Sequence, residues 1–343
     1  MVMRHDILFM NDKLVNELAG NDMKGVIHDV ERALSLLDSG EALNPEKAVM
    51  KWGKTVEDEN TLGRINAMGA YLGGEYQMAG IKWIGSGPMN YKKGLPRASV
   101  TVILNDPDTK LPLAVSDGTK ISVMRTGAAG GLAVRYLARK NAAVMTICGA
   151  GAQSRTQLEA SLIERPSIEK VYIYDIVKER SEQFAEEMKA QFGIQVVPVE
   201  EAGLPDAVKE SDIITTVTLA SQPIVKGEWI KKGALMLNMA DFEFTYDCVQ
   251  MADKIVVDTW NNIKHRKIST VALMYADGLI KDEDITAHLG EIINGKKPGR
   301  ENEDEIIYFN AVGMGIEDLA VVTRAYRAAR EQGLGVTVNY WAE

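Results

Sequence analysis

The sequence predicts an α/β protein built on a doubly wound parallel sheet, accompanied by a smaller α+β domain. The chain has 343 residues, which is enough for two domains that each bury a core. From residue 127 onward, short apolar runs alternate with helical segments. These runs lack the period-2 alternation of half-exposed strands, so they indicate a parallel sheet covered on both faces.

The N-terminal part has a different pattern and is expected to form the smaller domain. Apolar residues recur every three or four positions from 23 to 37, which predicts an amphipathic helix. Asn21 or Asp22 can cap its start, and Gly40 can end it. Short strands separated by Gly-, Pro- and Asn-rich turns are expected at 81–84, 100–104 and 111–115.

The alternation after residue 127 supplies the larger domain. Helices are predicted at 132–138, 152–163 and 180–192, and strands at 144–148, 171–174, 194–199, 213–217, 234–239 and 255–258. A last helix at 316–332, ended by Gly333, is expected to close the smaller domain. The predicted division is therefore residues 1–125 with 311–343, and residues 126–310.

Composition argues against several classes of function. The net charge of −9 gives no electrostatic reason to bind nucleic acid or an anionic membrane. Two cysteines, Cys148 and Cys248, cannot build a disulfide framework, and the four histidines show no metal-ligand spacing. The first residues lack the apolar core of a signal peptide, and no run approaches the ~20 apolar residues that span a bilayer. We therefore expect a cytoplasmic protein without a metal, nucleic-acid or membrane partner.

A glycine loop follows the strand expected at 144–148. Gly149 permits a tight turn, and Gly151 lets the backbone approach a pyrophosphate at the N-terminus of the next helix. Asp175 ends the following strand, 24 residues after Gly151 and near the ~20 expected for the acid that binds the adenosine ribose hydroxyls. The pattern predicts a Rossmann domain that prefers NAD to NADP, because a carboxylate repels a 2′-phosphate. Ser154 replaces the third glycine, so a turn without cofactor and a solvated Asp175 remain alternatives.

Several further segments, taken with this loop, resemble the ornithine cyclodeaminase/mu-crystallin family. They are Gly80-Ile81-Lys82-Trp83, Arg125-Thr126-Gly127-Ala128-Ala129, the loop with Gln153, Asp212 to Thr218, and Val312-Gly313 with Glu317-Asp318. The resemblance covers about Ile7 to Val338. It implies a homodimeric NAD-dependent oxidoreductase that acts on the amine-bearing α-carbon of an amino acid or its imine.

The resemblance also implies roles for individual residues. Lys82 and Arg125 take positions that bind the substrate α-carboxylate, with Lys47 as a helping cation. Asp241 resembles the catalytic aspartate, and Lys82 is expected to serve catalysis beside it. Val312 lies in a segment that flanks the substrate. The positions that match NAD contacts are Thr126, Gly149, Gly151, Ala152, Gln153, Asp175, Thr218, Asn238 and Met239.

The chemistry of amino-acid oxidation agrees with these roles. A substrate carboxylate needs cations, and a planar Arg fork is the best of these. The amine must lose a proton before hydride leaves the α-carbon, and a carboxylate such as Asp241 can accept that proton. Ordinary surface charges are the alternative for Lys47, Lys82 and Arg125, and a loop cap is the alternative for Asp241.

Three departures from the family pattern bear on the substrate. Asn66 replaces a glutamate that contacts the side-chain amine in cyclodeaminases, which weakens the case for ornithine. Arg97, in Pro-Arg-Ala-Ser, resembles the N-(2-amino-2-carboxyethyl)-glutamate dehydrogenase branch, and a buried cation there would suit a second carboxylate. The segment around Asp241 lacks the usual Pro-Gly. A cyclodeaminase that recycles NAD internally, and a mu-crystallin-like binding protein, stay open as alternatives.

Overall fold

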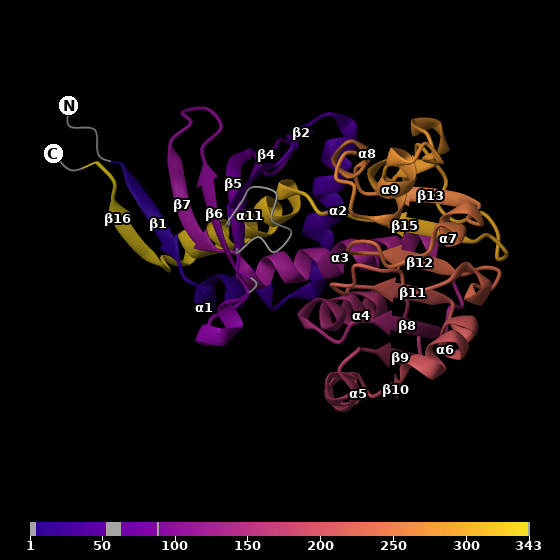
Figure 1. Cartoon of the computed structure of the whole chain (residues 1–343). Helices are drawn as coiled ribbons and strands as arrows, with labels where there is room; N and C mark the ends of the chain where they lie inside the picture. Colours follow the sequence, from indigo (N-terminus) through magenta and orange to yellow (C-terminus); the bar gives the residue numbers. More distant parts are fainter. Residues whose placement is uncertain (1–4, 53–62, 88, 342–343) are drawn as a thin grey trace. The chain divides into compact units, whose positions relative to one another are not determined.

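The structure is a computed structural model that describes residues 5–52, 63–87 and 89–341. The chain divides into two compact units (Figure 1). We call Met1–Arg125 with Met314–Glu343 the mixed-sheet unit, and Thr126–Gly313 the parallel-sheet unit. The second boundary follows Gly313, three residues beyond the position expected from the sequence. Helix α3 (Thr119–Leu137) contains the first boundary.

The mixed-sheet unit is organised around an eight-stranded sheet with the order β16-β1-β7-β6-β5-β4-β2, in which β3 also pairs with β4. Among the strand pairs that the structure describes in this sheet, only β1–β7 is parallel. The strands are β1 (Asp6–Met10), β2 (Ala42–Leu43), β3 (Ala48–Trp52), β4 (Gly63–Leu72), β5 (Met78–Ser86), β6 (Ala98–Asn105), β7 (Pro112–Asp117) and β16 (Val336–Asn339). The helices are α1 (Asp12–Val15), η1 (Asn16–Gly20), α2 (Met23–Ser39), η2 (Asn90–Lys93) and α11 (Gly315–Gln332).

Helix α2 confirms the caps read from the sequence. The Asp22 side chain accepts a hydrogen bond from the Gly25 N–H at 3.0 Å. Gly40 ends the helix in the left-handed region at φ 80°, which glycine adopts without strain.

Helix α11 lies against β4, β5 and β6 and against α2. Gly80 on β5 allows this close approach, because a Cβ there would meet the Ile103 carbonyl oxygen and lie 2.6 Å from the Leu319 Cδ1. The first turn of α11 is thereby held over the middle of β5, where Lys82 stands.

The parallel-sheet unit confirms the predicted doubly wound α/β fold. Its strands run in the order β10-β9-β8-β11-β12-β15-β13-β14, and all pairs are parallel. The strands are β8 (Val144–Cys148), β9 (Lys170–Tyr174), β10 (Gln195–Val199), β11 (Ile213–Thr216), β12 (Leu235–Asn238), β13 (Lys254–Val257), β14 (Ala287–His288) and β15 (Ile307–Asn310). When β8 is taken as strand 1, the order β10-β9-β8-β11-β12 corresponds to the 3-2-1-4-5 order of a Rossmann sheet.

Helices connect these strands and cover the sheet. They are α4 (Ala152–Glu164), α5 (Lys178–Phe192), η3 (Glu201–Gly203), α6 (Leu204–Glu210), η4 (Gly227–Trp229), α7 (Tyr246–Gln250), α8 (Trp260–Ile263), α9 (Thr270–Ala276), η5 (Asp282–Asp284) and α10 (Leu289–Ile293). Apolar side chains from β11, β12 and β15 pack with those of α6, α7 and α9 in a buried core.

One sequence-based expectation about the backbone is wrong. For this segment the sequence predicts a helix only at 132–138, but α3 begins at Thr119 and residues 125–131 lie inside it. The glycines serve close helix packing. A Cβ at Gly127 would lie 2.6 Å from the Thr156 carbonyl oxygen on α4, and one at Gly131 would lie 2.8 Å from the Ala160 Cβ.

Among the described residues, no helix is long and apolar enough to cross a membrane. The same residues contain no group of three or more His, Cys, Asp or Glu side chains that could hold a metal ion.

Candidate active site

The glycine loop of the parallel-sheet unit has the geometry of a dinucleotide turn. Gly149 has φ 100°, and its N–H donates to the Tyr174 carbonyl oxygen at 2.7 Å. Gly151 is the N-cap of α4 and offers no side-chain cap to that helix. A Cβ at Gly151 would meet no described atom within 4 Å, so the backbone there is open to a ligand. Ala152 and Gln153 begin the helix, and their N–H groups belong to its first turn.

Asp175 lies at the carboxyl end of β9, beside this loop, and it also organises the loop. One carboxylate oxygen accepts the Ala150 N–H at 2.8 Å and the other accepts the Val177 N–H at 2.9 Å. Each oxygen has a second lone pair, so the carboxylate retains capacity for ribose hydroxyls. Gln153 has a buried Oε1 without a hydrogen-bond partner among the described residues, an acceptor that a ligand hydroxyl or amide could satisfy.

The next strands, β11 and β12, bring more of the predicted cofactor residues to the same edge of the sheet. Thr218 follows β11, and Asn238 ends β12. The Met239 N–H donates to the Thr216 carbonyl oxygen at 3.1 Å, which continues the ladder past the strand. Asp241 follows in a partly exposed loop, and its carbonyl oxygen accepts from the Asn238 Nδ2 at 3.1 Å.

In the mixed-sheet unit, the structure places Lys82 in a buried polar cluster. Its Nζ lies 2.8 Å from the Asp318 Oδ1 and donates to the Ser122 Oγ at 2.7 Å. The side chains of Lys82 and Asp318 are 1% and 0% exposed. Lys82 therefore does not point into solvent, the alternative that the sequence left open.

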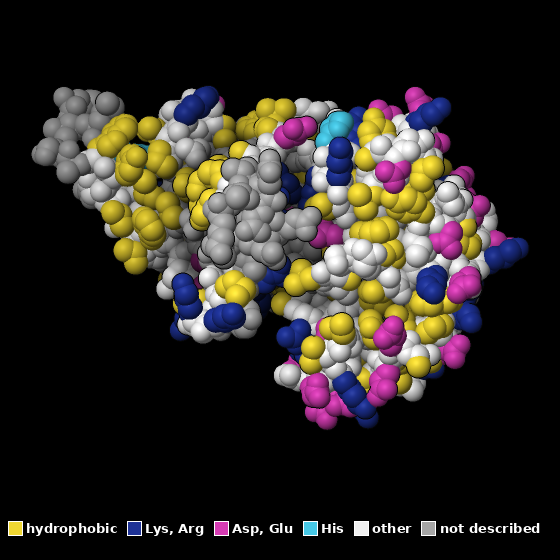
Figure 2. Space-filling model, viewed as in Figure 1, with side chains coloured by type: hydrophobic (Ala, Val, Ile, Leu, Met, Phe, Trp, Pro, Cys, Tyr) yellow, Lys and Arg dark blue, Asp and Glu magenta, His cyan; other side chains and the backbone are white. Residues whose placement is uncertain are grey.

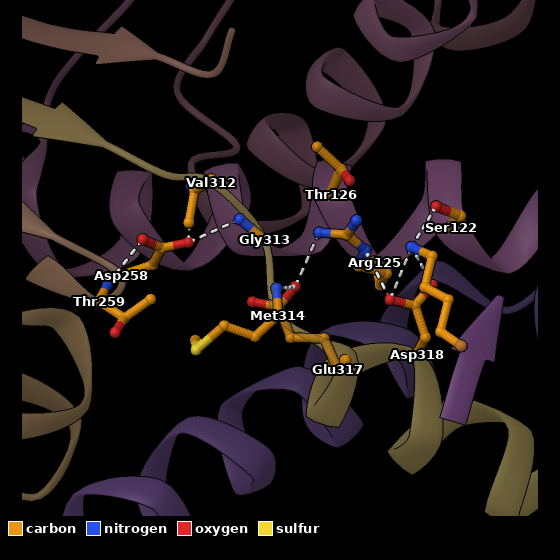
Figure 3. Close-up of polar contacts among 12 residues, drawn as sticks. Ser122, Arg125, Thr126, Asp258, Thr259, Val312, Gly313, Met314, Glu317 and Asp318 are labelled. Atoms are coloured by element: carbon orange, nitrogen blue, oxygen red, sulfur yellow. Dashed lines mark hydrogen bonds and ion pairs between the residues drawn. The ribbon is translucent and has the colours of Figure 1, made fainter. Parts of the chain in front are cut away.

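Arg125 joins the same cluster from α3. Its Nη1 donates to the Glu317 Oε2 at 2.9 Å, and its Nε lies 3.2 Å from the Asp318 Oδ2. Glu317 also accepts the Met314 N–H at 3.2 Å, at the start of α11 (Figure 3). Two cations thus face two carboxylates, and Arg125, at 10% exposed, is the member that reaches the surface.

The cluster gives Lys82 an unusually low pKa for a lysine. Burial, together with the charge of the neighbouring Arg125, lowers the pKa of Lys82 from 10.5 to about 8. Asp318 and Glu317 act in the opposite direction, because they favour the ammonium form. The result is an amine that changes its protonation state near neutral pH.

The remaining cations predicted from sequence lie elsewhere in the mixed-sheet unit. Lys47 is partly exposed and immediately precedes β3. Ala48, the first residue of β3, pairs with Ala67 on β4. The next residue of β4, Met68, pairs with Lys82. Arg97 is exposed and precedes β6, five residues before Val102, which pairs with Lys82. That separation is roughly 16 Å along a strand. The expectation of a buried cation at Arg97 is wrong, because the residue lies in the turn before β6.

Thr126 and Val312 occupy structural positions in the parallel-sheet unit. The Thr126 carbonyl oxygen accepts from the Gln157 Nε2 at 2.8 Å. The Val312 and Gly313 N–H groups both donate to the Asp258 Oδ2 at 2.7 Å (Figure 3). Asp258 is 3% exposed and had no role in the sequence-based prediction.

Three acids complete the two groups of residues and had no predicted role. Glu317 and Asp318 are two adjacent acids at the start of α11, which is a signal that the sequence does contain. Glu243, which is fully buried beside Asp241, gave no signal in the sequence.

A family model and several known proteins match nearly the whole chain. Residues 12–333 match the model of the ornithine cyclodeaminase/mu-crystallin family. N-((2S)-2-amino-2-carboxyethyl)-L-glutamate dehydrogenase of Staphylococcus aureus is 33% identical over 341 residues, covering 99% of this chain and 100% of that protein. Alanine dehydrogenase of Archaeoglobus fulgidus is 36% identical over 325 residues, covering 93% and 94%.

Solved structures show the same similarity. The Δ1-pyrroline-2-carboxylate reductase of Thermococcus litoralis, in complex with NADH and L-proline, matches with a TM-score of 0.87 and 38% identity over 97% of this chain and 100% of that chain. An archaeal alanine dehydrogenase dimer with bound NAD matches with a TM-score of 0.89 and 33% identity over 98% and 100%.

Proposed function

Because the chain belongs to the ornithine cyclodeaminase/mu-crystallin family, we propose that it is an NAD-dependent oxidoreductase of amino acids or imines. The reaction takes place at the carbon that bears the α-nitrogen. The observation that carries the proposal is the buried cluster of Lys82, Arg125, Glu317 and Asp318. Such a cluster presents a cation and a proton-exchanging amine to a substrate that has both a carboxylate and an amine.

The parallel-sheet unit has the residues to hold NAD. The pyrophosphate of NAD fits the open backbone at Gly151 and the first turn of α4, and Asp175 suits the adenosine ribose. The other proposed contacts are Thr126, Gly149, Ala152, Gln153, Thr218, Asn238 and Met239. When bound, NAD supplies the hydride acceptor or donor for the α-carbon.

The mixed-sheet unit has the residues to hold the substrate carboxylate. Arg125 is the one member of the cluster whose side chain is measurably exposed, and a guanidinium pairs with a carboxylate through a planar fork. Glu317 and Asp318 hold this fork in a fixed orientation, which reduces the entropy lost on binding. Lys47 and Val312 remain proposed substrate contacts, and so does Arg97 for a second carboxylate.

Lys82 and Asp241 are the proposed proton carriers. With a pKa of about 8, Lys82 can take up a proton when the substrate amine is deprotonated, and Asp318 stabilises the resulting ammonium. Because Lys82 is 1% exposed, we propose that Ser122, 2.7 Å from its Nζ, passes the proton. Asp241 is partly exposed and is available as the second acid or base.

The relatives guide the choice of substrate and direction. They are named for alanine, for Δ1-pyrroline-2-carboxylate and for an opine-type amino acid. Asn66 lies on β4 two residues from Met68, which pairs with Lys82, so it shares that face of the sheet. It has no charge with which to hold a second amine. We therefore favour a substrate without a side-chain amine over ornithine, and a dehydrogenase or reductase over a cyclodeaminase.

A panel of amino acids and cyclic imines, mixed with NAD or NADH and followed at the nicotinamide absorbance, tests this function. We expect turnover with at least one small amino acid or imine. Asp241→Asn should lower kcat by roughly 100-fold or more while leaving NADH affinity unchanged. Ammonia release without net NADH would favour a cyclodeaminase. Tight NADH binding without any turnover would favour a binding protein.

We also propose that the protein is a homodimer joined through the mixed-sheet unit. Apolar side chains gather over β1 and β16 (Figure 2), and Phe9, Val336, Val338 and Tyr340 are among the exposed large hydrophobic residues. A monomer rarely leaves such a patch uncovered. Light scattering should give twice the chain mass, and Val336→Glu with Val338→Glu should give a monomer.

A further inference from the structure

Glu243 is a buried carboxylate that the proposed mechanism does not use. It lies two residues after Asp241, and it is 0% exposed. Its carbonyl oxygen accepts the N–H groups of Ile224 and Val225 at 2.8 and 3.0 Å, and the next residue, Phe244, bridges to Val225. These contacts to Ile224 and Val225 fix the backbone at residues 243 and 244. The side chain of Glu243 is buried in the parallel-sheet unit.

The carboxylate connects two parts of the chain that follow different strands. Its Oε1 accepts both the Thr218 N–H at 2.6 Å and the Thr218 hydroxyl at 2.5 Å. Its Oε2 accepts from the Asn238 Nδ2 at 3.1 Å, and the same amide nitrogen donates to the Asp241 carbonyl oxygen. One side chain thus ties the loop after β11 to the turn that carries Asp241.

These two loops lie where the nicotinamide half of NAD is expected. The proposed site has the adenosine at β9 and the pyrophosphate on the turn after β8. In the sheet order β9-β8-β11-β12, a dinucleotide that continues in the same direction reaches the carboxyl ends of β11 and β12. Thr218 and Asn238 stand at those two ends.

The carboxyl group of Glu243 lies in an environment that disfavours its charged form. Its described hydrogen-bond partners are neutral groups of Thr216, Thr218 and Asn238, and none of the described lysines or arginines forms an ion pair with it. Burial raises its pKa above 4.5, and the nearby Asp241 charge raises it further. A carboxyl group buried without a cationic partner costs stability, which points to a role other than stabilising the fold.

We propose that Glu243 is a positioning residue that holds Thr218 and the Asp241 turn in the conformation that receives the nicotinamide half of NAD. This inference rests on the proposed function, because it takes the roles of Thr218 and Asp241 from it. The carboxylate acts through these neighbours.

The experiment compares NADH affinity with stability in Glu243→Gln. Glutamine keeps the size and one acceptor oxygen, but its amide nitrogen must face a donor. We expect the Kd for NADH, measured by fluorescence titration, to rise about tenfold. The midpoint of thermal unfolding without nucleotide should stay the same or rise, because glutamine cannot carry the charge that burial disfavours.

Glu305→Gln is the matched control. Glu305 is also buried and pairs with Lys254 at 3.2 Å, but it precedes β15, at the opposite end of that strand from the NAD site. Its loss should lower the unfolding midpoint and leave NADH affinity unchanged. A Glu243→Gln protein with a lower midpoint and unchanged affinity would overturn the inference, because the residue would then be merely structural.

Two further measurements separate the possible failures. If Glu243→Gln does not fold, Glu243→Asp keeps the charge but shortens the side chain, and wild-type affinity in that variant would also overturn the inference. If the wild-type protein does not bind NADH, the proposed function fails first. If the wild type and Glu243→Gln bind equally well, only the role of Glu243 is lost.

Discussion

Lys82 and Asp318 are 236 residues apart in the chain, yet their Nζ and Oδ1 atoms lie 2.8 Å apart in an almost fully buried ion pair. The contact forms because α11 approaches β5 closely at Gly80. It places a carboxylate beside an amine whose pKa is lowered by burial to about 8.

Asp318→Asn should shift the pH dependence of the reaction. Asp318 raises the pKa of Lys82, so its removal lowers that pKa below about 8. In the oxidative direction the neutral amine is the active form, and kcat/KM rises as pH rises through this pKa. We expect the midpoint of the rise to move to lower pH by roughly one unit. Profiles of kcat/KM from pH 5 to 10 would measure it.

The same variant should be less stable, because it leaves the Lys82 ammonium buried beside Arg125. Breaking a buried pair destabilises by roughly 3 kcal/mol, which urea unfolding would detect. Asp108→Asn, at an exposed turn, is the control and should change neither quantity. An unshifted pH profile in active Asp318→Asn would remove Lys82 from the proton transfer.

Arg125→Lys should weaken substrate binding and spare the cofactor. Lysine keeps the charge but cannot contact Glu317 and Asp318 through separate nitrogens, as Arg125 does at 2.9 and 3.2 Å. We expect the KM for the amino acid to rise about tenfold or more. The Kd for NADH should not change, because the proposed cofactor residues lie in the parallel-sheet unit. A changed Kd with an unchanged KM would contradict these assignments.

Gly127→Ala should lower stability, whereas Gly151→Ala should weaken NADH binding. A Cβ at residue 127 meets the backbone of Thr156, and we expect a loss of about 1–3 kcal/mol in the free energy of unfolding. A Cβ at residue 151 meets no described atom, so that variant should be as stable as the wild type. It should nevertheless bind NADH more weakly, because the methyl group occupies the space of the pyrophosphate. Full NADH affinity in Gly151→Ala would move the cofactor away from this turn.

Asp175→Asn should relax the preference for NAD. The amide keeps one oxygen for a backbone N–H but removes the negative charge that repels a 2′-phosphate. We expect the ratio of kcat/KM values for NADP and NAD to increase about tenfold. Glu179→Gln, an exposed charge change in the next helix, serves as the comparison. Equal ratios in the wild type and Asp175→Asn would show that selectivity lies in other contacts.

Local signals account for the features that the sequence predicted well. Helix α2 was predicted to within a few residues because Asp22 and Gly40 mark its ends. The glycine turn and Asp175 follow strands that are themselves apolar runs, so their place in the sheet followed from the alternation. The α/β class and NAD as cofactor came from these same segments.

The features that were missed depend on contacts between distant residues. No strand was predicted at Ile307–Asn310, the residues of β15, which lies inside the sheet between β12 and β13. The pairing of Arg125 with Glu317 spans 192 residues, and nothing local marks it. Arg97 was expected to be buried because its motif looked like that of relatives, but exposure is set by the turn before β6.

Because α3 is one continuous helix, its residues 122–131 serve two unrelated structural purposes. Ser122 and Arg125 serve charge pairing, whereas the bare positions at Gly127 and Gly131 serve the fit against α4. Transplanting the whole segment onto another helix would therefore carry the guanidinium along with glycines that lower helix stability there. A design that needs only the anion-binding function would keep Ser122 and Arg125 and a neighbouring helix that carries an acid. It could replace Gly127 and Gly131 with alanine.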